Sequence, residues 1–191
     1  MTRRQKQLFS LLAIVALGGL SLLNPQWLGS QQLLPERLTP QPGYYSVSQI
    51  YDGDTIGVLM NGQVERVRLI GVDTPETQRP GSPVECFGLA ASDYTRRQIG
   101  PQSVRLASDP QSTNRDRYQR LLRYVFLPDG RLLNAEIIRG GYGFAYTYFP
   151  FDRADEFRSL QSEAMANSRG LWAGCEVTTD QRGQQHTAPA D

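Results

Sequence analysis

The chain has 191 residues, and its 39% hydrophobic and 20% charged residues are typical of one globular domain with tails. Twenty Lys and Arg side chains stand against 19 Asp and Glu, and residues 1–35 hold three of the bases and no acid, so the remainder carries a formal charge of −2. This balance excludes an overall positive field that would hold nucleic acid non-specifically, so a polyanion must be bound by local groups.

The N-terminal segment has the pattern of an export signal. Three basic residues within the first six precede residues 8–23, which carry no charge and are slightly too few for a typical membrane span of about 20 residues. We predict that residues 1–30 are a signal peptide or a signal-anchor, and that the protein is exported to the periplasm or the medium, or is held on the membrane by an uncleaved segment. Residues 31–43 contain three prolines and are predicted to be a linker.

Two cysteines, Cys86 and Cys175, are compatible with an oxidising compartment. A bridge between them would close a loop worth about 4–5 kcal/mol in the chain-entropy model. Export favours this disulfide over the alternative of two unrelated free thiols. The only histidine, His186, lies in the tail, which disfavours a Cys–His nucleophile.

The first regular elements are predicted as a three-stranded meander. A strand begins at Tyr44, is interrupted at residues 52–55, and resumes with alternating apolar residues as far as Met60. Asn61-Gly62 is a strong hairpin signal. The following strand is expected to run from Val64 to Asp73, where Pro75 stops it.

The remaining elements complete a small barrel. Helical spacing is expected at residues 84–99 and 133–139, and in a last helix that a capping box of Asp152 and Asp155 would start and Gly170 would end. Strands are expected at residues 104–106 and 121–127, with a polar, mobile segment, residues 109–120, between them. The predicted fold class is α+β, a five-stranded OB-type Greek-key β-barrel with three packed helices over residues 44–175, followed by a disordered tail, residues 176–191.

Two aspartates fall at neighbouring strand ends. Asp54 begins one strand and Asp73 ends the next, and the turn at Asn61-Gly62 brings these two ends side by side. Two carboxylates and the Thr74 carbonyl supply oxygen ligands of the kind that calcium takes, whereas no nearby Cys or His favours zinc or copper. The sequence therefore predicts a calcium site here, with a polar turn as the alternative.

Acidic and basic side chains near this site suit phosphodiester chemistry. Glu76 could take a proton from an attacking water, although an exposed loop glutamate is the alternative. Arg68 lies between apolar residues of a strand, an unfavourable place for a charge without a role. Arg120 closes a segment that also contains Arg115 and Arg117, for which a solvated surface run is the alternative. Guanidinium groups stabilise the charge that builds up on a phosphoryl group in transfer.

Tyrosines follow the Gly140-Gly141 pair. Tyr146 and Tyr148 would share a face of an extended segment, where aromatic rings can stack a base. Core packing is the alternative for each of them.

Five motifs together carry a resemblance. They are YDGDT, RVRLIGVDTPET, RDRYQRLLRYVF, LNAEIIRGGYGFAYTY and GLW, and their order and spacing resemble the staphylococcal-nuclease (thermonuclease) family from about Val47 to Trp172. The resemblance implies an OB-type barrel with three helices, and a calcium-dependent endonuclease that cuts DNA and RNA and leaves 3′-phosphorylated products.

The resemblance also implies roles for individual residues. Calcium ligands are matched by Asp54, Asp73 and the Thr74 carbonyl, the proposed general base by Glu76, and the arginines on the scissile phosphate by Arg68 and Arg120. The nucleotide-binding groups are matched by Arg117 (where the family often has lysine), Tyr118, Tyr146 and Tyr148. The cysteine pair resembles that of exported members. Gln119 departs from the pattern, because the family has glycine beside the second arginine.

Together these features predict an exported, calcium-dependent endonuclease with DNA and RNA as substrates and no protein partner. One alternative is a non-catalytic nucleic-acid-binding module on the same barrel, although such modules have lost the acidic and arginine residues that are present here. Another is an enzyme that acts on a different phosphodiester or a small nucleotide.

Overall fold

The computed structural model describes residues 43–77, 81 and 83–190. The predicted signal segment and nearly all of the predicted linker lie outside these residues. Within the described ranges, no helix is long and apolar enough to cross a membrane.

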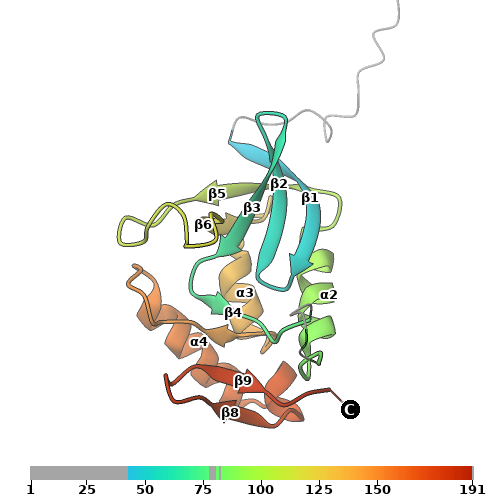
Figure 1. The fold of residues 1–191 in the computed structure, drawn as a ribbon, viewed down its shortest axis with the longest axis vertical. Helices are drawn as coiled ribbons and strands as arrows, with labels where there is room; N and C mark the ends of the chain where they lie inside the picture. Colours follow the sequence, from blue (N-terminus) through green and yellow to red (C-terminus); the bar gives the residue numbers. More distant parts are fainter. Residues whose placement is uncertain (1–42, 78–80, 82, 191) are drawn as a thin grey trace, which may run out of the picture. The chain divides into compact units, whose positions relative to one another are not determined.

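A closed five-stranded barrel forms the centre of the described domain (Figure 1). Its strands are β1 (Tyr44–Asp52), β2 (Thr55–Met60), β3 (Gln63–Leu69), β5 (Ser103–Ala107) and β6 (Leu121–Phe126), in the spatial order β1-β2-β3-β6-β5. Antiparallel pairs link all neighbours except β3 and β6, which pair in parallel. The barrel and its helices confirm the predicted α+β class.

The β2–β3 hairpin turns where the sequence predicts it. Asn61 and Gly62 both have positive φ, 51° and 79°, and Met60 pairs with Gln63 across the turn. Positive φ at both central residues is the requirement of the two-residue turn that Asn-Gly favours. The register that follows pairs Thr55 with Arg68, so the polar end of β2 lies beside the arginine of β3.

The strand predicted from Val64 to Asp73 is divided in two. β3 ends at Leu69, and β4 (Val72–Asp73) pairs instead with β7 (Phe144–Ala145) outside the barrel. Gly71 makes the break, with a φ of 72° and with no room for a side chain, since an added Cβ would lie 2.6 Å from the Phe151 ring. This turn carries Asp73 away from the barrel wall towards the C-terminal half of the chain.

Three helices pack around the barrel, namely α2 (Gly88–Ile99), α3 (Leu133–Arg139) and α4 (Ala154–Ala166). The predicted short helix has the bounds of α3. α2 begins four residues later than predicted, because Phe87 has a left-handed φ of 71° and Glu85 pairs with Pro189 in a β-bridge.

The predicted ends of the last helix are wrong. No side chain caps the N-terminus of α4: Asp152 accepts a hydrogen bond from Gln111, and Asp155 pairs with Arg158 of the same helix. Beyond its C-terminus, Ser168 has a positive φ of 48°, while Gly170 begins the 3₁₀ helix η2 (Gly170–Ala173).

The C-terminal segment is folded, in contrast to the predicted disordered tail. β8 (Val177–Thr179) and β9 (Gln185–Thr187) form an antiparallel hairpin, which we call the C-terminal hairpin. The chain after it is fixed by backbone hydrogen bonds from Cys86 N to Ala188 O and from Ala190 N to Val84 O, both 2.8 Å. Strands of three residues are too short to show a clear alternation of apolar and polar side chains, so the sequence analysis missed them.

The predicted disulfide is formed. Cys86 and Cys175 are bonded with a Cα–Cα distance of 5.9 Å, and no cysteine of the described residues is free. The bridge joins the chain just before α2 to the chain just before β8. It therefore anchors the base of the C-terminal hairpin to the barrel domain.

Candidate active site

Two carboxylates from separate elements meet on one arginine. Asp54 lies in the turn between β1 and β2, and Asp73 ends β4. Arg68 of β3 forms ion pairs with both, at 2.7 Å from its Nη2 to Asp73 Oδ1 and in direct contact with Asp54 Oδ1. The side chains of Asp54, Arg68 and Asp73 are 3%, 16% and 18% exposed, so this cluster is sheltered from water but open to one side.

Burial and the two acids set the charge state of this cluster. Burial opposes the charged form of Arg68, but the neighbouring Asp54 and Asp73 outweigh it and raise the pKa of the guanidinium. Burial raises the pKa of Asp73, with Arg68 opposing and Asp54 adding to the rise. Next to them, burial and the charge of Asp54 raise the pKa of Asp52 to about 6. The site thus concentrates negative charge that a cation would stabilise.

Thr74 is held directly against this cluster. Its backbone N–H donates to Asp54 Oδ2 at 2.9 Å. The residue is 8% exposed, and within the described part of the chain its buried Oγ1 has no hydrogen-bond partner. The threonine backbone is therefore fixed at the carboxylate pair by a contact that the sequence did not predict.

Glu76 and Arg120 line the same pocket as Asp54, Arg68 and Asp73. Two hydrogen bonds join the backbone of Glu76 to Glu85. The Glu76 N–H donates to the Glu85 carboxylate at 3.0 Å, and the Glu85 N–H donates to the Glu76 carbonyl at 2.9 Å. The structure therefore brings these five side chains, which come from four parts of the chain, into one cleft.

Arg120 is held at the entrance to β6. Its Nε donates to Asp116 Oδ2 at 2.7 Å, and its Nη1 lies 3.5 Å from Thr55 Oγ1. Burial works against the charged carboxylate, but the hydrogen bonds from Arg120 hold the pKa of Asp116 below its usual value. Between the two, Gln119 adopts a left-handed φ of 65°, a backbone conformation that glycine adopts more readily than other residues.

Arg117 and Tyr118 form an exposed pair beside Arg120. The Arg117 Nη2 donates to the Tyr118 hydroxyl at 2.6 Å, and its guanidinium carbon is 4.7 Å from the centre of the Tyr118 ring. Tyr118 as a residue is 63% exposed. Neither Arg117 nor Tyr118 lines the pocket, so the structure does not bring this pair into the catalytic cleft. Arg115 does not line it either and pairs with Glu65 of β3 at 2.9 Å, as a surface residue does.

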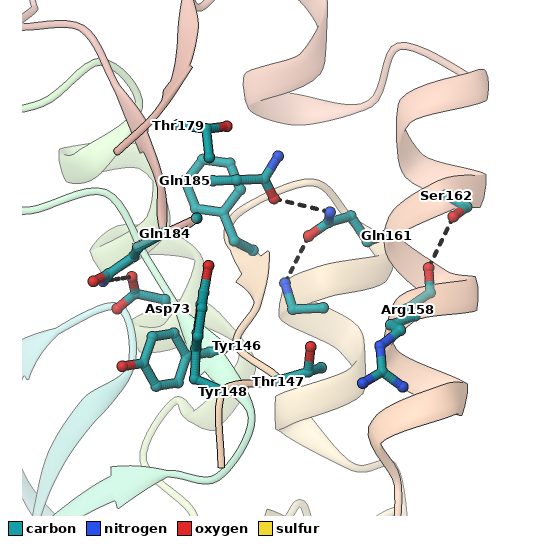
Figure 2. A pocket seen from close by; sticks show the side chains of 13 residues that line it. Asp73, Tyr146, Thr147, Tyr148, Arg158, Gln161, Ser162, Thr179, Gln184 and Gln185 are labelled. Atoms are coloured by element: carbon teal, nitrogen blue, oxygen red, sulfur yellow. Dashed lines mark hydrogen bonds between the residues drawn. The ribbon is translucent and has the colours of Figure 1, made fainter. Parts of the chain in front are cut away.

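Tyr146 and Tyr148 lie beyond Asp73, with ring centroids 5.1 Å apart. They line a second cavity of about 500 Å³ next to the first (Figure 2). Both tyrosines are at least partly exposed there, so they are not core residues.

Two site residues come from the C-terminal hairpin and were missed by the sequence analysis. The Gln184 side-chain amide donates to Asp73 Oδ2 at 2.9 Å, and His186 lines the first pocket 3.9 Å from both Glu85 and Asp180. The available signals were the β-branched run Val177-Thr178-Thr179 and the turn residue Gly183, which together favour a hairpin.

The donor chemistry fits a hard divalent cation. Across the described ranges, no cluster of three or more His, Cys, Asp and Glu side chains has the arrangement of a metal site. The set predicted from sequence does not require one, because it consists of two carboxylates and a backbone carbonyl. Such an oxygen-only set, sheltered and rich in negative charge, suits calcium or magnesium better than zinc or copper.

Comparison with known proteins decides the family. Residues 66–174 match the model of the staphylococcal nuclease homologues, which is more than half of the chain. The chain belongs to the staphylococcal nuclease family. It is 42% identical over 132 residues to the thermonuclease of Staphylococcus intermedius, an alignment that covers 67% of this chain and 75% of that protein.

Other relatives agree with this assignment. The thermonuclease of Staphylococcus hyicus is 38% identical over 130 residues, which are 68% of this chain and 75% of the relative. The endonuclease YncB of Bacillus subtilis is 34% identical over 137 residues, which are 71% of this chain and 64% of the relative. The chain is therefore a member of a family of nucleases, which are hydrolases, as the motifs predicted. The match to the family model ends at residue 174, before the C-terminal hairpin.

Proposed function

We propose that this protein is an exported, calcium-dependent endonuclease that hydrolyses phosphodiester bonds of DNA and RNA to 3′-phosphorylated products. The observation that carries the proposal is the convergence of Asp54, Arg68, Asp73, Glu76 and Arg120 on one pocket, in a chain of the staphylococcal nuclease family. A binding module of the same fold would have no need to retain all five.

In this proposal Asp54, Asp73 and the Thr74 carbonyl would hold a calcium ion, which would supply positive charge to stabilise a phosphate bound beside them. Glu76 takes a proton from the attacking water. Its backbone is fixed by Glu85, and its carboxylate accepts a hydrogen bond from Thr77 N at 3.1 Å, which helps to orient it for this task. The water oxygen bonds to phosphorus as the opposite bond, from phosphorus to the 5′-oxygen, breaks. The phosphate therefore stays on the 3′ side, and the 5′-oxygen leaves as a hydroxyl after it takes a proton from solvent.

The two arginines stabilise the charge that develops on the phosphoryl oxygens. Arg120 is fixed by Asp116 and faces the pocket from the start of β6. Arg68 stays ionised between its two acids and can donate from the same position to a phosphate that arrives beside them. Arg117, Tyr118, Tyr146 and Tyr148 are proposed to bind the nucleotides on either side.

Export is proposed from the N-terminal signal pattern, which lies outside the described residues, and is supported by the Cys86–Cys175 disulfide. Such bridges persist in oxidising compartments and are rare in the cytosol.

The test is cleavage of a closed circular plasmid and of an RNA by the purified protein, first in millimolar calcium and then with an excess of chelator. Millimolar calcium is appropriate because extracellular calcium sites bind at about 10⁻⁴–10⁻³ M. The proposal expects calcium-dependent loss of both polymers. Folded protein that cuts neither of them, or that cuts equally well in chelator, would overturn it.

A further inference from the structure

A second cavity continues from the catalytic pocket. We call it the outer compartment; among its lining residues are Tyr146, Tyr148, Arg158, Ser162, Thr179 and Gln185 (Figure 2). It shares Asp73 and Gln184 with the catalytic pocket. A strand whose phosphate lies at Asp73 can therefore pass from one compartment into the other without leaving the protein surface.

Three parts of the chain form its walls. One wall is the segment with the two tyrosines, the second is one face of α4, and the third is the C-terminal hairpin. Gln161 of α4 joins all three, since its side-chain oxygen accepts from Ala145 N at 2.7 Å and its amide nitrogen lies 3.0 Å from Gln185 Oε1. The walls are thus held at a fixed separation.

The chemistry of the lining matches a nucleotide. Tyr148 is 48% exposed, and its ring lines the compartment, where a base can stack on it. Amide side chains such as Gln185 can exchange hydrogen bonds with base edges, and the guanidinium of Arg158 can bind a phosphate. The volume of about 500 Å³ lies within the range of about 300–1,000 Å³ that is common for small-ligand sites.

We propose that the C-terminal hairpin and α4 complete the nucleotide subsite at Tyr146 and Tyr148, so that Thr179 of the hairpin and Ser162 of α4 lie against the nucleotide next to the scissile phosphate. The inference rests on the proposed nuclease function and extends it to a segment that the family match does not reach. The disulfide at Cys175 and the hydrogen bond from Gln184 to Asp73 fix the hairpin to the catalytic side.

The test fills the outer compartment from α4. Ser162→Trp places a bulky ring into the compartment, while Ser159→Trp makes the same exchange at an exposed serine of the same helix that does not line it. Thr179→Trp fills the compartment from the hairpin side. Binding of a fluorescent single-stranded oligodeoxynucleotide is measured by anisotropy in chelator, so that no cleavage is needed, and thermal melting checks that each variant is folded.

The expected result is a loss of about tenfold in oligonucleotide affinity for Ser162→Trp and Thr179→Trp, as for the loss of one stacked base, with Ser159→Trp close to wild type. Hydrolysis of bis(4-nitrophenyl) phosphate, a phosphodiester without any nucleoside, should fall less than the oligonucleotide affinity in Ser162→Trp and Thr179→Trp, and should be unchanged in Ser159→Trp. Equal oligonucleotide affinity of Ser162→Trp and Ser159→Trp would overturn the inference, as would equal losses on both substrates.

The two proposals can fail separately. A wild-type protein that binds the oligonucleotide but hydrolyses neither substrate would refute the nuclease function, whereas the comparison of the two serine variants would still decide the subsite by binding alone.

Discussion

The cleft has two sides that are built differently. On the barrel side, Arg68 belongs to β3 and Asp54 directly precedes β2. The ladder of these two strands continues through a 2.9 Å hydrogen bond from Leu69 N to Asp54 O. On the opposite side, Gln184 lies in the turn and His186 on β9 of the C-terminal hairpin. The two strands of this hairpin have three residues each, and they depend on one disulfide and a few backbone hydrogen bonds.

This difference assigns catalysis to the barrel side and part of substrate binding to the hairpin side. Arg68 lies on a barrel strand, and the Leu69 N–H holds Asp54 beside it. Asp73 is fixed by the β4–β7 pair, and Arg120 by Asp116. The side chains assigned to the neighbouring nucleotide lie in part on an added segment, where small shifts are tolerated. Substitutions on the barrel side should therefore change kcat, and those on the hairpin side should change KM or the free energy of unfolding.

The largest effect is expected from the proposed base on the barrel side. Glu76→Gln keeps the shape but removes the proton acceptor, and should lower kcat by about 10²–10⁴-fold with little change in KM. Steady-state hydrolysis of an oligonucleotide measures both constants. The control is Glu176→Gln, an exposed glutamate that precedes the C-terminal hairpin, which should leave kcat unchanged. Full turnover by Glu76→Gln would remove the assignment.

Breaking the disulfide tests the hairpin side. Cys86→Ser combined with Cys175→Ser removes a bridge across 89 residues of sequence, and should lower the free energy of unfolding by about 4–5 kcal/mol. Urea denaturation measures this loss. Under conditions where the variant remains folded, KM for DNA should rise while kcat stays close to wild type. A fall in kcat at constant KM would contradict the separation between the two sides.

Asp109 tests how much buried hydrogen bonds contribute to the stability of the barrel side. Its carboxylate accepts hydrogen bonds from the Tyr124 hydroxyl at 2.7 Å and from Asp152 N and Gln111 N at 2.9 and 2.8 Å. Asp109→Asn replaces one acceptor oxygen by a donor, and should lower the free energy of unfolding by about 1–3 kcal/mol at neutral pH. Asp129→Asn, at an exposed turn, is the control and should cost less than about 0.5 kcal/mol.

This effect should depend on pH. Burial opposes ionisation of Asp109, but the hydrogen bonds from Tyr124, Asp152 and Gln111 outweigh it and lower the pKa of the carboxyl. A lowered pKa stabilises the folded state above the pKa of the unfolded chain, about 3.9, and this contribution is lost as the pH falls through the folded pKa. The difference between wild type and Asp109→Asn should thus be constant above about pH 5 and shrink below about pH 4. If the difference in the free energy of unfolding instead grew on acidification, the pKa of Asp109 would be raised rather than lowered.

The smallest effect is expected at Gln119, beside Arg120. Its left-handed φ of 65° costs a non-glycine residue about 1–2 kcal/mol, and glycine would remove this strain at an entropic cost of about 0.4–1 kcal/mol. Gln119→Gly should therefore raise the free energy of unfolding by about 0.5–1 kcal/mol, as measured by urea denaturation. Gln181→Gly, at an exposed position without positive φ, should instead destabilise slightly.

The barrel side was largely predictable from sequence and the hairpin side was not. Asn61-Gly62 fixes the register of β2 and β3, and that register alone brings Asp54, Arg68 and the chain towards Asp73 together. The disulfide followed from two cysteines and an export signal. These signals are local or strongly specific, so they can be recognised from the sequence without knowledge of tertiary contacts.

The errors share a physical cause, because tertiary contacts overrode local preference. Gly71 breaks the expected strand since the Phe151 ring leaves no room for a side chain there. Asp152 fits a capping pattern but is bonded to Gln111 instead. Residues 177–187 are polar and short, and they fold because the disulfide and the barrel domain hold them, which composition does not reveal.

The most direct test of the account is calcium binding by calorimetry to the wild-type protein and to Asp54→Asn and Asp73→Asn, each checked for folding by circular dichroism. The account predicts one site in the wild type with a dissociation constant of about 10⁻⁴–10⁻³ M, and a loss of at least about tenfold in affinity in both variants. Unchanged calcium affinity in folded Asp54→Asn and Asp73→Asn would contradict the central claim that the carboxylate pair on Arg68 is the metal site of this nuclease.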